Sequence, residues 1–235
     1  MQLIPLKSQK IESGDNLLQS FLSALESANE SVGEGDIIVI ASKVLAFSQG
    51  RLVESADIKE LVKKEADVIL DEGEMVITLK NKILIPNAGI DNSNTPDGQA
   101  VLWPDDPFGS ARGIRKELIG KFNLKNLGVL ITDSHCQPLR AGTTGIAIGW
   151  AGFEGVQDEI GKKDLFGRPM VYTKIAIADD LASAANLLMG ETDASIPFVI
   201  VRDLNITFTD KEFSEDDYFI GPEECIYKGF YGKKL

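Results

Sequence analysis

Asp36-Ile37-Ile38-Val39-Ile40-Ala41-Ser42-Lys43 is the stretch that decides the fold. The run from Ile37 to Ala41 is apolar without interruption and has the length of a strand, which is typical of a strand buried on both faces of its sheet. The polar pair Ser42-Lys43 follows at once, where side chains at a strand end can face a ligand. We therefore expect a central buried strand whose exit borders a site.

The elements around this strand predict an α+β fold with mixed or antiparallel sheets. Because helices and strands do not alternate regularly and a hairpin is evident, this class fits better than a doubly wound parallel sheet. The expected helices are 15–30, capped by Ser13 or Asp15; 107–121, with Arg112, Arg115 and Lys116 on its exposed side; and 179–189, capped by Asp179. The expected strands are 75–79 and 83–85, which form the hairpin; 128–132, ended by Asp133; 142–149; 170–178; and 196–202.

Composition limits the classes of function. The 235 residues carry 24 Lys and Arg against 36 Asp and Glu, a formal charge of −12, and this acidity argues against a nucleic-acid partner. With 43% apolar residues the chain can bury a core, and no linker or repeat divides it. We interpret residues 1–235 as a single domain, in which 203–235 form an acidic, aromatic C-terminal arm.

The cysteine count and the hydropathy pattern bear on the compartment. Two cysteines, Cys136 and Cys225, are too few for a disulfide framework, so a reducing, cytoplasmic location is expected. No signal peptide is recognised, and no apolar run approaches the length of a bilayer span, so no membrane association is expected.

The usual nucleotide and nucleophile motifs are missing. The sequence contains neither a P-loop nor a dinucleotide-binding glycine fingerprint. His135 is the only histidine, and its neighbour Cys136 suggests a thiol–imidazole hydrolase. Adjacent residues on an extended chain point to opposite faces, which favours a polar loop residue beside a small thiol instead.

Carboxylates in loops remain as candidate metal ligands. Asp91, with Asn94 three residues later, offers oxygen ligands of the kind that Mg²⁺ or Mn²⁺ prefers, or else forms a local Asx-turn. Asp133-Ser134 follows an apolar strand, and there too a simple turn is the alternative. Glu191 follows a helix that ends at Gly190, where an acid is unfavourable without a partner.

In their order along the chain these pieces resemble the coenzyme F420-0:L-glutamate ligase family, over about residues 3–202. The specific pieces are Asn87-Ala88-Gly89-Ile90-Asp91-Asn92-Ser93-Asn94 and Asp106-Pro107 running to Ser110-Ala111-Arg112. Supporting pieces are Ile4-Pro5-Leu6-Lys7, Ala41-Ser42-Lys43-Val44, Leu102-Trp103-Pro104, Thr132-Asp133-Ser134, Asp164 to Arg168, Ala178 to Leu181, and Met189-Gly190-Glu191.

The resemblance implies a GTP-dependent ligase that adds L-glutamate to a deazaflavin precursor through an acyl phosphate, with Mg²⁺ or Mn²⁺, on two intertwined α+β subdomains in a homodimer. The implied metal ligands are Asp91, Asp133, Ser134 and Glu191, and the implied catalytic residues are Asp91, Asp133 and Arg112. The implied nucleotide contacts are Ile4, Pro5, Leu6, Lys7, Ser42, Lys43, Asn94, Met189, Gly190 and Thr192.

Departures from the family pattern keep other functions open. Phe47 stands where a second lysine is usual, and Ser134 to Arg140 lack one arginine and a tryptophan of the family segment. Because an altered segment can mean an altered acceptor, a folate γ-glutamyl ligase is the first alternative, and ATP can replace GTP. A non-catalytic relative that binds a nucleotide is the second alternative.

Overall fold

The computed structural model describes residues 1–55 and 57–231, so the last four residues of the predicted C-terminal arm lie outside it. A five-stranded sheet forms its centre, with the strand order β1-β12-β2-β8-β9. Only the β2–β8 pairing is parallel among the four pairings of this sheet. The bounds are β1 (Gln2–Leu6), β2 (Ile37–Ala41), β8 (Gly128–Cys136), β9 (Thr143–Ala151) and β12 (Phe198–Arg202).

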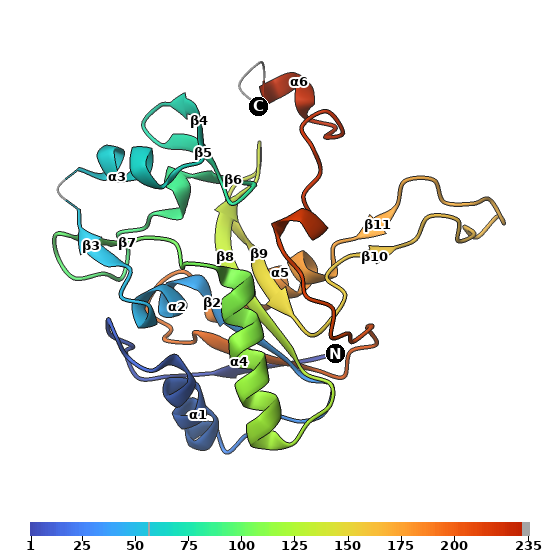
Figure 1. The fold of residues 1–235 in the computed structure, drawn as a ribbon, viewed down its shortest axis with the longest axis horizontal. Helices are drawn as coiled ribbons and strands as arrows, with labels where there is room; N and C mark the ends of the chain where they lie inside the picture. Colours follow the sequence, from blue (N-terminus) through green and yellow to red (C-terminus); the bar gives the residue numbers. More distant parts are fainter. Residues whose placement is uncertain (56, 232–235) are drawn as a thin grey trace.

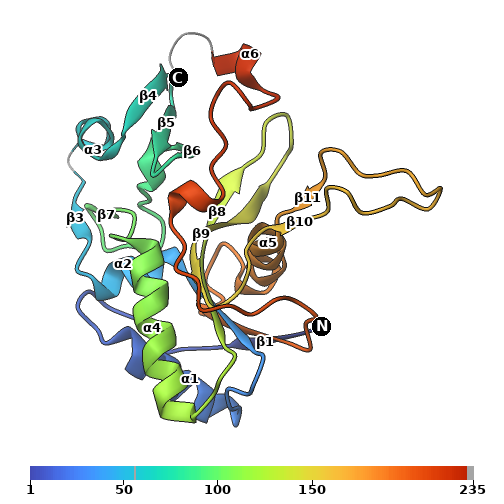
Figure 2. The same cartoon turned by 45° about the vertical axis from the view of Figure 1, so that its right-hand side comes forward.

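Helices cover both faces of this sheet (Figures 1 and 2). One apolar cluster joins Ile38 and Ile40 to Phe21 of α1 (Leu17–Ala28), to α2 (Ser42–Ser48) and to α4 (Pro107–Phe122). A second cluster joins Ile37 and Val39 to α5 (Ile177–Met189). Because successive residues of β2 point into different cores, the strand is buried on both faces, as its unbroken apolar run predicted.

A smaller lobe lies beside the central sheet, at the upper left of Figure 1. It contains the β4-β5-β6 sheet and the β3-β7 pair, and Val62, Val76 and Ile90 belong to its own apolar cluster. The predicted hairpin is confirmed as β5 and β6. The bounds are β3 (Leu52–Glu54), α3 (Ile58–Glu65), β4 (Val68–Glu72), β5 (Val76–Lys80), β6 (Ile83–Pro86), η1 (Asn87–Gly89) and β7 (Gln99–Val101). Helices and mixed sheets thus confirm the α+β class.

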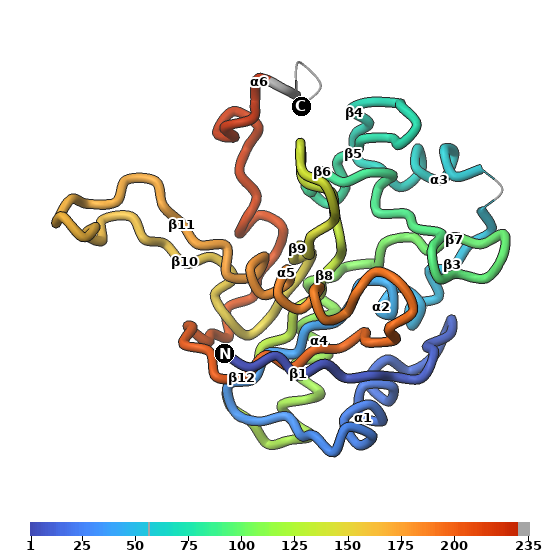
Figure 3. Tube along the Cα trace, turned by 180° about the vertical axis from the view of Figure 1, so that it is seen from behind, coloured from blue at the N-terminus to red at the C-terminus, as the bar shows by residue number. Residues whose placement is uncertain are grey.

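Two segments extend the body (Figures 1 and 3). The hairpin of β10 (Gln157–Asp158) and β11 (Lys174–Ile175) projects away from the sheet as a long arm. The C-terminal segment, with η2 (Glu215–Asp217) and α6 (Lys228–Tyr231), packs on the body: Phe213 is buried, and the Tyr218 ring lies 5.2 Å from that of Trp150. Within the described residues, every helix is too short or too polar to cross a bilayer.

Several predicted boundaries are wrong. Asp133 does not end its strand, because β8 continues to Cys136 by pairing with β9 after β2 has ended. Residues 170–178 are not one strand: β11 covers two residues, and α5 begins at Ile177. Asn16 caps α1 in place of Ser13 or Asp15, and Asp179 lies in the first turn of α5 rather than at its cap.

The arginines of α4 are less exposed than expected. Arg112 donates from Nη1 to the carbonyl of Phe213 at 2.8 Å, and Arg115 donates to the carbonyl of Leu127 at 2.8 Å. Both side chains are half-buried, whereas Lys116 is exposed as predicted. These arginines hold the C-terminal segment and a loop against α4.

Candidate active site

A cavity of about 600 Å³ opens at the carboxyl ends of the parallel strands β2 and β8. Ala41 and Thr132 are the last partners of the β2–β8 register, so Ser42 and Asp133, each one residue further, lie side by side where β2 ends and β8 continues with β9. Ligands of α/β sheets bind outside such strand ends. The buried run that decides the fold therefore also positions this cavity.

The cavity brings together most of the site residues that the sequence predicted. Its lining includes Ser42, Lys43, Asp91, Asn94, Asp133, Ser134, Met189, Gly190, Glu191 and Thr192. Phe47, at the position where a lysine was expected, lines it too. The structure does not bring Arg112 to the cavity, and Ile4, Pro5 and Leu6 lie in β1, while Lys7 lines a neighbouring groove beside α1.

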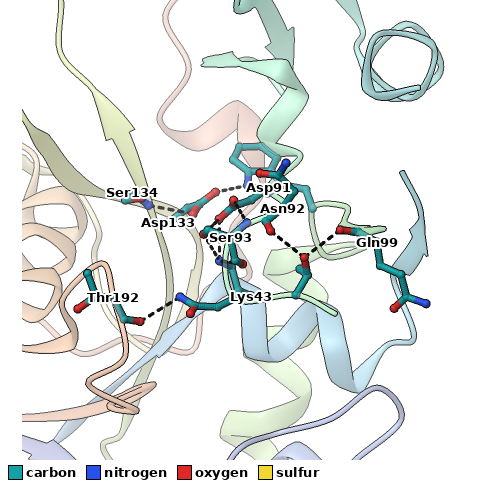
Figure 4. A network of polar contacts seen from close by, with 11 residues as sticks. Lys43, Asp91, Asn92, Ser93, Gln99, Asp133, Ser134 and Thr192 are labelled. Carbon is teal, nitrogen blue, oxygen red and sulfur yellow. Dashed lines mark hydrogen bonds and ion pairs between the residues drawn. The ribbon is translucent and has the colours of Figure 1, made fainter. Parts of the chain in front are cut away.

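Asp91 and Lys43 form the centre of a polar network (Figure 4). The Lys43 ammonium donates to Asp91 Oδ2 at 2.6 Å, and to the carbonyl and the hydroxyl of Ser93 at 2.8 and 2.9 Å. Asp91 Oδ1 also accepts from the Ser93 N–H at 2.7 Å, so the Asx-turn of the alternative reading is present as well. Burial opposes ionisation of Asp91, but Lys43 and Ser93 outweigh it and lower its pKa.

The carboxyl group of Asp133 lies opposite this network and has few charged partners. It accepts a hydrogen bond from the indole N–H of Trp103 and one from the N–H of Ser134 at 2.9 Å. Burial raises its pKa, and these hydrogen bonds only partly offset that effect. A cation that a ligand brings next to such a desolvated carboxylate would stabilise its charged form strongly.

Trp103 links the loop of Asp91 to Asp133. A Cβ on Gly89 would lie 2.5 Å from the Trp103 ring, so only glycine, here at φ +74°, allows the loop this close. The preceding Ala88 is buried, has φ +53°, and donates its N–H to Thr78 Oγ1 at 2.9 Å. The loop is thus held in a strained conformation that places Asp91 beside Asp133.

The end of α5 forms the third side of the cavity. Glu191 Oε1 accepts from Asn186 at 2.9 Å and from the Thr143 hydroxyl at 3.2 Å. The Asn94 side chain donates to the carbonyl of Thr192 at 3.0 Å. This hydrogen bond joins the loop of Asp91 to the segment that follows α5, so the three predicted carboxylates belong to one connected wall.

His135 and Cys136 do not form a dyad. They are successive residues of β8, paired with Thr144 and Thr143, so their side chains leave opposite faces of the strand. Cys136 is exposed, and the His135 ring faces Gln137 at 3.2 Å between Nε2 atoms. The alternative of a thiol hydrolase therefore has no geometric support.

The charge of the cavity bears on which ligands fit. Its lining carries the acids Asp91, Asp133, Glu191 and Asp193 against the bases Lys10 and Lys43. Among the described residues no three acidic, histidine or cysteine side chains already form a metal cluster. Carboxylate and hydroxyl oxygens nevertheless suit Mg²⁺ and Mn²⁺, and the ammonium on Asp91 shows that this carboxylate attracts a cation.

Sequence reasoning missed Trp103 and Thr78 as supports of the site. The signal for Trp103 was available: a buried indole N–H requires an acceptor, and Asp133 was already a candidate. Thr78 gave no such signal, because its role depends on the pairing of β5 with β6.

Comparisons with known proteins identify the family of the chain. The profile of the family described as F420-0:Gamma-glutamyl ligase matches residues 5–203. A relative named Coenzyme F420:L-glutamate ligase in Methanocaldococcus jannaschii is 40% identical over 202 residues, 77% of this chain and 80% of its own. Relatives of the same name are 35% identical in Methanothermobacter thermautotrophicus (82% and 84% covered) and 32% identical in Archaeoglobus fulgidus (93% and 92% covered). The chain therefore belongs to the F420-0:gamma-glutamyl ligase family.

Proposed function

We propose that this protein is a ligase that joins L-glutamate to a carboxylate of a coenzyme F420 precursor, with GTP as the energy source and a divalent metal. The observation that carries the proposal is the cavity at the β2–β8 edge, where Asp91, Asp133 and Glu191 gather. Family membership and the names of the relatives support the reaction and the acceptor class.

The balance of charge in the cavity favours a metal together with a nucleotide. A triphosphate entering a wall with four acids and two bases would be repelled unless cations accompany it. Asp91, Asp133, Ser134 and Glu191 would hold Mg²⁺ or Mn²⁺, and the bound metal supplies neutralisation of phosphate charge. Lys43, beside Asp91, would then contact the phosphates together with Ser42 and Asn94.

The chain's own residues orient the two steps of the reaction. In the first, a carboxylate oxygen of the acceptor bonds to the γ-phosphorus, and GDP leaves with the electrons of the broken P–O bond. In the second, the amine of L-glutamate attacks the acyl carbon, phosphate departs, and the nitrogen loses a proton. The strained loop of Asp91, wedged on Trp103, fixes the reacting groups without further rearrangement.

A mass assay tests the proposal. Purified protein with GTP, Mn²⁺, L-glutamate and a deazaflavin acceptor is expected to yield an acceptor heavier by one glutamyl residue, and Asp133→Asn to abolish the product. Parallel reactions with ATP in place of GTP, and with folate in place of the deazaflavin, distinguish the two nucleotides and test the folate γ-glutamyl ligase alternative. Absence of a glutamyl product with every acceptor, despite metal-dependent GTP binding, would indicate a non-catalytic relative instead.

We also infer a homodimer, in which the β10–β11 arm packs on a second copy of the chain. The arm exposes large apolar side chains: Leu165 is 101% exposed, Tyr172 90% and Phe166 83%. Several large apolar side chains exposed on one short segment are typical of an interaction site. The family resemblance favours a second copy as the partner.

Light scattering during gel filtration measures the oligomeric state. Wild-type protein is expected at twice the chain mass, and Leu165→Asp with Phe166→Asp at the chain mass with an unchanged circular dichroism spectrum. A wild-type monomer at micromolar concentration would contradict the dimer without touching the ligase proposal.

A further inference from the structure

A second cavity, of about 300 Å³, lies where the β5–β6 hairpin, the β8–β9 pair and the C-terminal segment meet. It shares no lining residue with the first cavity. The two are nevertheless neighbours along one face of β8, because Asp133 lines the first cavity and His135, two residues later on the same face of the strand, lines the second. A ligand that extends along β8 could therefore occupy both.

The walls of the second cavity are largely apolar. Leu79, Ile83 and Leu84 come from the hairpin, Ile146 from β9, and Phe219 and Pro222 from the C-terminal segment. Lys82, also in the lining, lies 5.2 Å from the centre of the Phe219 ring. A volume at the lower end of the range for small-molecule sites, with aromatic and aliphatic walls, suits a flat ring system.

The polar groups of this cavity include a hydroxyl that lacks a partner. The Tyr218 hydroxyl is buried and has no hydrogen-bond partner among the described residues. Burial and the nearby Asp179 raise the pKa of Tyr218, so the hydroxyl keeps its proton. A buried donor without an acceptor is rare and indicates a missing partner.

The C-terminal segment gives the cavity its separate character. Tyr218, Phe219, Ile220 and Pro222 all belong to it, and all lie beyond residue 203, where the family match ends. The wall that contacts a ligand here is therefore supplied by a part of the chain outside the matched region. Such a wall can discriminate between acceptors with different ring systems, whereas the catalytic carboxylates contact only the part that these acceptors share.

We propose that the second cavity binds the fused heteroaromatic ring of the acceptor, with the Tyr218 hydroxyl donating to a ring carbonyl or nitrogen, while the acceptor carboxylate reaches the first cavity beside Asp133. This inference rests on the proposed function and deepens it: the carboxylates of the first cavity perform the transfer, and the C-terminal segment selects the acceptor. His135 and Asp179 complete the polar edge of the ring site.

Ring binding can be measured apart from catalysis. The probe is the deazaflavin chromophore without a glutamyl tail, titrated by fluorescence into the full chain without nucleotide, with pteroate as a second probe. Tyr218→Phe is expected to weaken ring binding about tenfold, the loss of one buried hydrogen bond. It should leave the melting temperature unchanged, because the hydroxyl has no partner to lose. Leu84→Trp fills the cavity and is expected to abolish binding of the ring.

Matched controls and outcomes separate this inference from the ligase proposal. Tyr172→Phe, at an exposed residue of the β10–β11 arm, should bind the ring like wild type, and all variants should bind Mn²⁺ and GTP like wild type. Equal ring affinity in wild type, Tyr218→Phe and Leu84→Trp, or no affinity in wild type, overturns the inference even if glutamate is transferred. Loss of ring binding in both variants sustains it even if no glutamyl product forms, in which case the ligase proposal alone fails.

Discussion

Gly145→Ala is expected to disturb both the stability of the protein and its active site. Gly145 lies opposite Ser134 in the β8–β9 pairing, and its Cα faces α5. A Cβ added there would lie 2.4 Å from the carbonyl oxygen of Ala182 and 2.9 Å from the Cβ of Asn186. The carbonyl group of a helix cannot rotate away as the end of a flexible side chain can. To restore an ordinary contact distance, α5 must therefore move away from β9 by about 1 Å.

The magnitude follows from that displacement. Overpacking of this kind costs about 1–3 kcal/mol of unfolding free energy, and each kcal/mol lowers Tm by about 2–4 °C in a chain of this size. The same movement carries Asn186, which holds Glu191 at 2.9 Å, away from the strand of Asp133. A displacement of about 1 Å at a catalytic site can reduce kcat by about a hundredfold, so activity should fall more than stability.

Differential scanning calorimetry and the glutamyl-transfer assay measure the two effects. Gly113→Ala is the matched control, because this exposed glycine lies inside α4 with no atom within 4 Å of an added Cβ. It should raise stability by about 0.5–1 kcal/mol through helix propensity. If Gly145→Ala melts at or above the wild-type temperature and keeps full activity, the close packing of α5 on β9 is not what positions Glu191.

Asp36→Asn should lower the free energy of unfolding, measured by urea titration, by about 3 kcal/mol. The reason is that the buried Asp36 accepts hydrogen bonds from Arg202 Nε and Nη2 at 2.9 and 2.8 Å. A decrease of less than about 1 kcal/mol would contradict this. Burial raises the pKa of Asp179 in the folded protein above its ordinary 3.8. Its contribution to the free energy of unfolding is therefore complete below pH 3.8 and is lost as pH rises through the folded pKa. Asp179→Asn should therefore gain stability over wild type between about pH 4 and 7, and a pH-independent difference in Tm would refute this linkage. Lys43→Met should bind Mn²⁺ alone more tightly, because the ammonium no longer competes for Asp91, and should bind GTP more weakly. If calorimetric titrations show that both affinities rise or both fall, Lys43 does not have this double role.

Local pattern predicted the central sheet where burial alone determines the structure. The run Ile37 to Ala41 could only be a doubly buried strand, and the β5–β6 hairpin was equally clear from its turn. The end of β8 was missed because its polar residues extend past the end of β2 and pair only with β9. Residues 170–178 have strand propensity but no partner strand along most of their length, and pairing rather than propensity decided their conformation.

The candidate site was predictable in its carboxylates and not in its supports. Asp91, Asp133 and Glu191 are distant in sequence, yet all line one cavity: Asp91 follows η1, Glu191 follows α5, and Asp133 lies in β8 where its pairing with β2 ends. The Trp103 wedge on Gly89 depends on a contact between two loops, which no periodicity reveals. Arg112 shows the converse: a basic residue in a matching motif whose guanidinium is engaged by the C-terminal segment instead.

The position of β12 in the sheet has a consequence for how the chain reaches its native state. β12 lies between β1 and β2, although most of the chain separates it from both in sequence. During synthesis, the edges of β1 and β2 that pair with β12 stay unpaired until residues 198–202 have left the ribosome. Insertion of this strand completes the sheet, so a ribosome-stalled chain ending before residue 198 should be sensitive to protease, and one extended well beyond residue 202 should be resistant.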